Sequence, residues 1–121
     1  MNLRIPLLVL ISALTFSVTA RASAPVTMQL VIKNRVFTQT NLVLPANTKV
    51  KLIVKNEDLI PAEFESTDLS REVVVPGHTS VVIYIDPLSP GKYNFFNDFN
   101  HAAQGSVLVN APESAKTSSP K

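Results

Sequence analysis

The stretch PGKYNFFNDFNHAAQGSVLV, Pro90 to Val109, decides the fold. It opens with a Pro-Gly turn signal, after which KYNFF forms a short run rich in aromatic residues. A second apolar run, GSVLVN, extends from Gly105 to Asn110, and the residues between the two runs are mostly polar or small. The stretch therefore predicts two β-strands on either side of a polar loop.

Strand patterns continue towards the N-terminus. In KVKLIVKN, Lys49 to Asn56, Val50, Leu52 and Val54 share one face and lysines occupy the other, as in a half-buried strand. Similar runs cover 27–33, 72–75 and 79–85, and proline and glycine stand between the runs. Seven to eight short strands separated by turns predict an all-β fold, a β-sandwich with Greek-key connections.

The two ends of the chain differ from this strand-rich middle. Met1 to Val18 combines a positive start with an apolar run, and small residues follow, as in a secretory signal peptide. We expect a signal peptide over residues 1–22 with cleavage within 20–24, the alternative being an uncleaved anchor. The sandwich domain is expected over 25–110, and the small, polar tail 111–121 is expected to be disordered.

Charge and composition exclude several classes of partner. The chain has 11 basic and 9 acidic residues, so removal of Arg4 and Arg21 with the leader leaves 9 of each. A neutral chain without a basic face is not expected to bind nucleic acid or a membrane surface, and no membrane span is expected after cleavage. The absence of cysteine excludes disulfides.

Catalytic motifs are absent from the sequence. His78 and His101 are the only histidines, and no nucleophile motif or glycine-rich phosphate loop occurs. His78 follows a Pro-Gly turn, where an exposed polar residue is ordinary. No catalytic residue is therefore predicted.

The segment NEDLIPAEFES, Asn56 to Ser66, offers two carboxylates for a metal ion. On an extended backbone Glu63 and Glu65 project from one face, about 6.5 Å apart at the backbone. Two carboxylates at that spacing can chelate a hard or borderline cation. They can also be the solvated side of an edge strand, because charged residues protect such edges, and the segment alone favours this explanation.

The loop near the C-terminus adds a third carboxylate and an imidazole. Asp98 and His101 are separated by two residues, a spacing at which a tight turn can bring both onto one ion. Phe95, Phe96 and Phe99 would then form an apolar wall that excludes water. In the alternative, which the loop alone favours, Phe95 is core, the other two phenylalanines cap the sandwich end, and the polar residues face solvent.

Together the two segments resemble the cupredoxins. That family has a strand ending in N-x-x-x-x-P-H-N and a later P-G-x-Y-x-F-x-C-x-x-H-x-x-M-x-G loop, which supply two histidines, a cysteine and a methionine to copper. NEDLIPAEF and the Pro90 to Val109 stretch match this frame. Aligned on Tyr93 and Gly105, the four ligand positions hold Ala62, Asn97, Asn100 and Ala103. Because blue copper requires a thiolate, type 1 copper is excluded.

Further residues match a narrower pattern, and their number makes the match more specific. They are PAEFES at 61–66, Leu69, Arg71-Glu72, Pro76-Gly77, Pro87-Leu88, Pro90-Gly91, Tyr93, Phe95-Phe96, Asp98-Phe99 and Gln104-Gly105. The pattern resembles cupredoxin-like proteins of bacterial ferrous-iron uptake, the periplasmic component of Ftr-type systems, which are similar to the N-terminal domain of EfeO proteins. The resemblance implies a periplasmic protein that binds iron, with copper as a second candidate. Its implied partners are a periplasmic metal-binding protein and a membrane iron permease.

Carried over by position, the resemblance implies Glu63, Glu65 and Asp98 as carboxylate ligands. The loop reads FFNDFNH where the branch usually reads FFDDFH, so His101 stands one place later than the usual histidine. Either the loop is repacked so that His101 serves, or the site has weakened or changed. Glu72 is a further carboxylate, for which a salt bridge with Arg71 is the ordinary explanation.

Two functions remain open at this point. The first is a component that binds iron and passes it on or helps to oxidise it, without being an enzyme by itself. Carboxylates with one imidazole suit Fe(II), Fe(III) or Mn(II) better than Cu(I), which prefers sulfur. The second is a metal-free cupredoxin-fold interaction subunit of an exported complex, suggested by the replacement of all four copper ligands.

Overall fold

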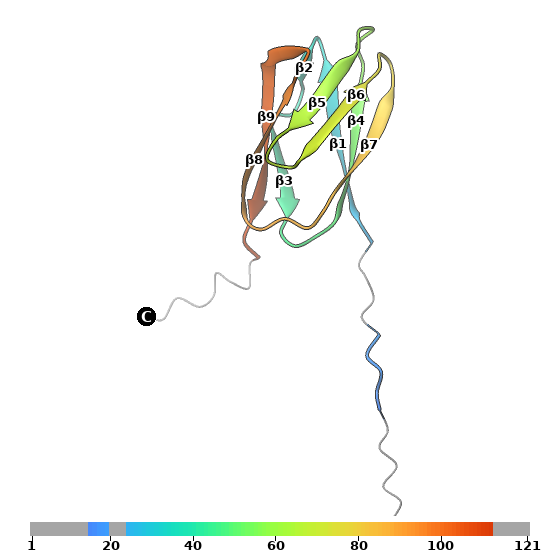
Figure 1. The fold of residues 1–121 in the computed structure, drawn as a ribbon, viewed down its shortest axis with the longest axis vertical. Helices are drawn as coiled ribbons and strands as arrows, with labels where there is room; N and C mark the ends of the chain where they lie inside the picture. Colours follow the sequence, from blue (N-terminus) through green and yellow to red (C-terminus); the bar gives the residue numbers. More distant parts are fainter. Residues whose placement is uncertain (1–14, 20–23, 113–121) are drawn as a thin grey trace, which may run out of the picture.

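The computed structural model of the chain describes residues 15–19 and 24–112, and residues 26–110 form an all-β sandwich (Figure 1). Its strands are β1 Val26–Lys33, β2 Val36–Phe37, β3 Asn41–Pro45, β4 Val50–Asn56, β5 Ala62–Ser66, β6 Arg71–Val75, β7 Ser80–Ile85, β8 Gly91–Asn97 and β9 Asn100–Asn110. The predicted fold class is confirmed. The described residues form nine strands rather than seven to eight, and one of them, β2, has only two residues.

The strands divide into two sheets that pack face to face. One sheet has the order β2-β1-β4-β7, and the other has the order β3-β9-β8-β5-β6. Two pairs are parallel, β1 with β4 and β3 with β9, while the other neighbouring pairs are antiparallel. Both ends of the described domain leave from one end of the sandwich, and the β8–β9 turn lies at the other (Figure 1).

Alternate residues along each strand face inward and form the core, as the two-residue period of a β-strand requires. Val50, Leu52 and Val54 of β4 are each no more than 1% exposed, as the alternation in the sequence predicts. They face an opposing layer that includes Leu42, Phe64, Phe95, Val107 and Val109. Hydrophobic burial between the two sheets is thus the main stabilising contribution in a chain without disulfides.

Phe95 occupies the centre of an aromatic cluster in this core. Its ring meets Phe37 edge-on at 5.0 Å between centroids and stacks on Phe64 at 5.4 Å. A Cβ atom at Gly105, opposite Phe95 on β9, would lie 2.4 Å from the Phe95 ring. Glycine is therefore required at this position, because any side chain would displace a buried phenylalanine.

The loop between β4 and β5 is held by one buried asparagine. The Asn56 side chain donates to the carbonyl oxygens of Ile60 and Val75 at 2.8 and 3.0 Å, and it accepts from Asp58 N at 3.0 Å. Residues 67–70 form a hydrogen-bonded turn between β5 and β6. His78 is exposed beyond the Pro-Gly turn, as predicted.

The ends of the chain fall largely outside this description. Most of the predicted signal peptide, residues 1–14 and 20–22, and the predicted tail from 113 onwards lie outside the described residues. Among the residues that are described, no helix is long and apolar enough to cross a membrane.

Candidate metal centre

The four positions that align with copper ligands carry no group that could replace those ligands. Ala62 and Ala103 are 3% and 2% exposed and contribute only methyl groups to the interior. Asn97 and Asn100 line a small pocket with Ala62 at the end of the sandwich, with room for about 20 Å³. That volume suits one water molecule. Without sulfur or imidazole, this pocket does not fit type 1 copper.

Both asparagines use their side chains for internal hydrogen bonds. Asn97 is 3% exposed, and its Oδ1 accepts from Glu63 N at 3.0 Å and from Phe99 N at 3.1 Å. Asn100 Nδ2 donates to the carbonyl oxygen of Arg35 at 2.9 Å. These two residues therefore stabilise the polypeptide at the position where a cupredoxin would bind its metal.

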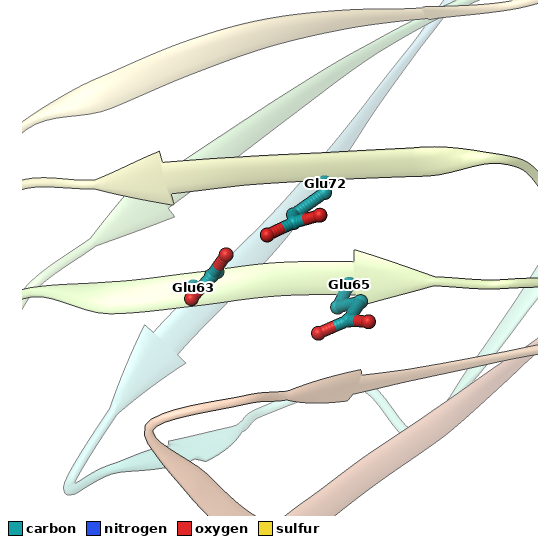
Figure 2. Close-up of side chains that lie close together, drawn as sticks. All are labelled: Glu63, Glu65 and Glu72. Carbon is teal, nitrogen blue, oxygen red and sulfur yellow. The ribbon is translucent and has the colours of Figure 1, made fainter.

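A different set of ligand atoms comes together on the outer face of the five-stranded sheet. Glu63 and Glu65 project from β5 on the face opposite buried Phe64, as their spacing predicts. Glu72 projects from β6, directly across from Glu65 in the antiparallel pair. One carboxylate oxygen of each lies within 4.8 Å of the others, so one ion could contact all three (Figure 2).

The position of β5 within the sheet decides between the two explanations of Glu63 and Glu65. The alternative of a solvated edge strand is wrong, because β5 lies between β8 and β6 within the sheet. Glu63 is only 8% exposed. A carboxylate removed from water in this way is costly unless it is protonated, hydrogen-bonded or paired with a cation.

The surroundings of Glu63 and Glu65 raise the pKa values of these two carboxyl groups. A hydrogen bond with Glu72 is the main cause of the raised pKa of Glu63, followed by burial and by the charges of Glu72, Asp98 and Glu65. Loss of hydration raises the pKa of Glu65, the charges of Asp98 and Glu72 add to this, and His101 opposes it. A bound cation would favour the charged forms of all these carboxylates.

Asp98 and His101 lie at the border of this cluster. Asp98 N donates to Glu63 O at 3.0 Å, which places the β8–β9 turn beside β5. His101 Nε2 is 2.8 Å from Asp98 Oδ1, and both side chains are largely exposed. The two residues therefore contact each other, next to the three glutamates. Their ligand atoms are not among those that come within 4.8 Å of one another in the three-glutamate group.

The phenylalanines of the loop are divided between the interior and the surface. Phe95 is core, as the alternative explanation expects, and Phe99 is 48% exposed. Phe96 pairs with Glu65 across the sheet, and its ring meets the His101 ring edge-on at 5.5 Å. Of the proposed apolar wall, Phe96 is thus the member that lies beside the carboxylates.

Glu72 is the member of the cluster that sequence reasoning underweighted. The expected ion pair with Arg71 does not explain it, because Arg71 reaches the other sheet: its Nη2 lies 3.6 Å from Asp86 Oδ2 and its Nε donates to Tyr84 O. Arg71 and Glu72 point to opposite faces of β6, as neighbours on a strand must. The alternation in REVVV indicates which face of the strand Glu72 occupies. Only the β5–β6 register shows that Glu72 lies opposite Glu65.

Comparison with known proteins agrees with this architecture. Residues 6–109 match the sequence profile of the cupredoxin-like domain. The uncharacterized protein RP394 of Rickettsia prowazekii is 43% identical over 84 residues, which cover 69% of this chain and 67% of that protein.

Solved structures with the same fold include copper proteins. Auracyanin A, a blue copper protein from Chloroflexus aurantiacus, has a TM-score of 0.61 at 17% identity, covering 72% of this chain and 100% of its own. The metal-binding domain of the Cu(I)-exporting P-type ATPase CopA of Streptococcus pneumoniae has a TM-score of 0.61 at 11% identity, covering 70% and 85%. At these identities the likeness shows the fold alone. With the profile match over most of its length, the chain belongs to the cupredoxin-like domain family.

Proposed function

We propose that the protein binds a metal ion at the carboxylate cluster on the outer face of β5 and β6. The convergence of Glu63, Glu65 and Glu72 to within 4.8 Å carries the proposal. Asp98 and His101 lie beside the cluster and would complete the coordination by a small movement of their shared turn. Three carboxylate oxygens within 4.8 Å of one another, with a fourth carboxylate and an imidazole at the border, offer the donor atoms that a hard or borderline cation binds.

Iron is the metal that this set of donors suits, with copper as the second candidate. Carboxylates and imidazole bind Fe(II), Fe(III), Mn(II) and Cu(II), whereas Cu(I) prefers thiolate or thioether ligands. The chain contains no cysteine, and Met28, on β1 of the other sheet, offers no thioether to the cluster. The site would therefore hold a cation that accepts hard or borderline ligands.

The wider role is a component of bacterial ferrous-iron uptake. In this proposal the protein is exported to the periplasm, receives iron beside a second metal-binding protein, and passes it to a membrane permease or helps to oxidise it. The resemblance of the PAEFES and FFNDF segments to that branch supports the assignment. The site runs from buried Glu63 to exposed Glu72 and consists of carboxylates, which suits binding and transfer more than independent catalysis.

Calorimetry of the metal-free protein tests the proposal. Fe(II) under anaerobic conditions, Fe(III), Mn(II) and Cu(II) should be titrated at micromolar protein, with Cu(I) as the ion expected to bind worst. Binding should disappear in a variant carrying Glu63→Gln, Glu65→Gln and Glu72→Gln. Glu57→Gln is the matched control, because Glu57 pairs with Lys33 and Lys55 on the other sheet. No binding of Fe(II), Fe(III) or Cu(II) by the wild-type protein would overturn the proposal.

A metal-free interaction subunit is the second candidate function. It is favoured by the internal hydrogen bonds of Asn97 and Asn100 and by the contact between Asp98 and His101, which leave no ligand directed at the usual copper position. Under this function a Glu63→Ala, His101→Ala double variant keeps full activity in the cell. Loss of iron uptake in that variant, with the protein folded and present at normal levels, would reject it.

A further inference from the structure

Asn97 connects the two halves of the proposed metal centre through a single oxygen atom. It is the last residue of β8 and is 3% exposed. Its Oδ1 accepts from Glu63 N, 34 residues earlier in the chain, at 3.0 Å. The same atom accepts from Phe99 N at 3.1 Å, two residues later. One side-chain oxygen thus holds both β5 and the β8–β9 turn.

The first of these bonds fixes the turn to the strand that carries the glutamates. Glu63 uses both of its backbone polar groups here, because its N–H donates to Asn97 and its carbonyl accepts from Asp98 N at 3.0 Å. Register between β8 and β9 becomes irregular at Phe96 and Asn97. At that irregularity the asparagine side chain supplies a hydrogen bond that a regular backbone ladder would otherwise provide.

The second bond sets the shape of the turn itself. An asparagine side chain that accepts from the N–H two residues later forms an Asx turn, which closes the backbone tightly. Only Asp98 and Phe99 separate Asn97 from its cross-strand partner Asn100. The direction of the Asp98 side chain, and through it that of His101 at 2.8 Å, follows from this geometry.

We propose that Asn97 is a positioning residue that keeps Asp98 and His101 beside Glu63 and Glu65 for metal binding. This inference rests on the proposed function, since the site it serves is the carboxylate cluster. It assigns to Asn97, at a position that aligns with a copper-ligating cysteine, a role in a different metal site. Asn97 acts through the residues it holds and would not itself contact the ion.

The competing explanation is that Asn97 only satisfies buried N–H groups and stabilises the fold. Asn56 provides a matched control for that possibility. It is similarly buried, at 1% exposed, and makes three side-chain hydrogen bonds where Asn97 makes two, but its partners are Asp58, Ile60 and Val75. Truncating Asn56 should therefore destabilise the protein without releasing the β8–β9 turn.

The experiment compares Asn97→Ala, Asn97→Asp and Asn56→Ala in the full chain after removal of the leader. Mn(II) and Fe(II) affinities are measured by calorimetry at a temperature where all variants are folded. We expect Asn97→Ala to lose about 10–100-fold in affinity, the usual effect of removing a group that orients ligands. Asn97→Asp should retain affinity, because it keeps the accepting oxygen. Asn56→Ala should reduce affinity much less than Asn97→Ala, because the Asn56 side chain makes its hydrogen bonds to Asp58, Ile60 and Val75 and not to residues of the turn.

NMR of the metal-free variants supplies a second readout that does not depend on metal binding. In Asn97→Ala the amides of residues 98–101 should become mobile on the nanosecond timescale, and the ring signals of His101 should move towards those of free imidazole. Asn56→Ala should leave both unchanged. If Asn97→Ala does not fold, Asn97→Ser replaces it, because the shorter hydroxyl cannot accept from both N–H groups.

The outcomes separate this inference from the proposed function. A wild-type protein that binds no metal overturns the metal-binding function, whereas the NMR comparison still decides whether Asn97 holds the turn. An ordered Asp98–His101 pair in Asn97→Ala, with affinity unchanged, would overturn the positioning role. Equal losses of affinity in Asn97→Ala and Asn56→Ala would also overturn it, since general destabilisation would then explain both.

Discussion

Glu65 on β5 lies directly opposite Glu72 on β6, so two carboxylates share one cross-strand position on the outer face of the sheet. Like charges in this arrangement repel and destabilise a sheet. Glu63 brings a third carboxylate oxygen to within 4.8 Å of these two, and Asp98 N donates to Glu63 O from the neighbouring turn. The proposed cation would neutralise this repulsion, so changes in the cluster should affect the stability of the apo protein and its metal affinity in opposite directions.

Replacing Glu72 with glutamine should have opposite effects on stability and on metal affinity. The melting temperature of the metal-free protein should rise at pH 7, because a like charge opposite Glu65 is removed. Affinity for Mn(II) should fall by about tenfold or more, given that even indirect partners of metal ligands contribute 10–100-fold. Thermal unfolding and calorimetry measure the two effects, with Glu57→Gln as control. A lower melting temperature or an unchanged affinity would contradict the prediction.

The cluster should make stability depend on pH in the direction opposite to that of most carboxylates. The pKa values of Glu63 and Glu65 are raised above the ordinary 4.5, so the folded state binds their protons more tightly than the unfolded state. Their contribution to stability is therefore complete below pH 4.5 and is lost as pH rises through the raised values.

This pH effect is measured against a variant that cannot titrate at these positions. As pH falls from 7 towards 4.5, the melting temperature of the wild-type protein should rise relative to that of the Glu63→Gln, Glu65→Gln, Glu72→Gln variant. The comparison cancels the other ionisable groups, which the two proteins share. Parallel curves for the two proteins would show that the fold does not perturb these carboxylates.

Metal should stabilise the protein most where the carboxylates are charged. At a free metal concentration 100 times Kd, binding to the native state adds about 2.7 kcal/mol to the free energy of unfolding. We expect this stabilisation at pH 7 with Mn(II), and a smaller one at pH 5, where protons compete for the same oxygens. Thermal unfolding with and without Mn(II), followed by removal with a chelator, measures it. An equal effect on the triple glutamine variant would place the ion elsewhere.

Substituting His101 should change which metal is preferred. Imidazole contributes more to Cu(II) than to Mn(II), which carboxylate oxygens satisfy. His101→Ala should therefore weaken Cu(II) binding by about tenfold more than Mn(II) binding, as judged by competition calorimetry. His78→Ala is the control, because His78 is exposed on the turn after β6. Equal losses for both metals would overturn the predicted preference, and unchanged affinity for both would show that His101 does not serve as a ligand.

The fold could be predicted from sequence because its determinants are local. Alternation in Lys49–Asn56 gives the buried and exposed faces of β4 directly, and Pro-Gly pairs mark turns before β7 and β8. Glu63 and Glu65 were also predictable as neighbours on one face, since a strand has a period of two. The alternative explanation places their strand at a sheet edge, and only tertiary pairing shows it between two others.

The rest of the site depends on contacts between distant segments. Glu72 joins the cluster through the β5–β6 register, while Arg71 turns to Asp86 across the sandwich. From the sequence, Asn97 is interpreted as a replaced metal ligand or a solvated loop residue. Its hydrogen bonds with the backbone N–H groups of Glu63 and Phe99 are seen only in the three-dimensional structure. Spacing along the chain carries no information about either arrangement.

Gly91, the first residue of β8, and Gly105, within β9, should respond very differently to alanine. At Gly105 a Cβ would lie 2.4 Å from the ring of Phe95, which is 1% exposed and packed between Phe37 and Phe64. Because that ring has no room to move, Gly105→Ala should lower the free energy of unfolding by about 1–3 kcal/mol, the usual cost of overpacking a core.

Gly91 is the control, because its added Cβ would come no closer than 3.6 Å to the Tyr93 ring, an ordinary contact. Gly91→Ala should therefore change stability by less than about 1 kcal/mol. Urea unfolding of both variants measures the difference. Because the clash at Gly105 is on the inner face of the sheet and the carboxylates are on the outer face, folded Gly105→Ala should keep wild-type Mn(II) affinity. A loss of affinity there would mean that the core and the carboxylate cluster are coupled.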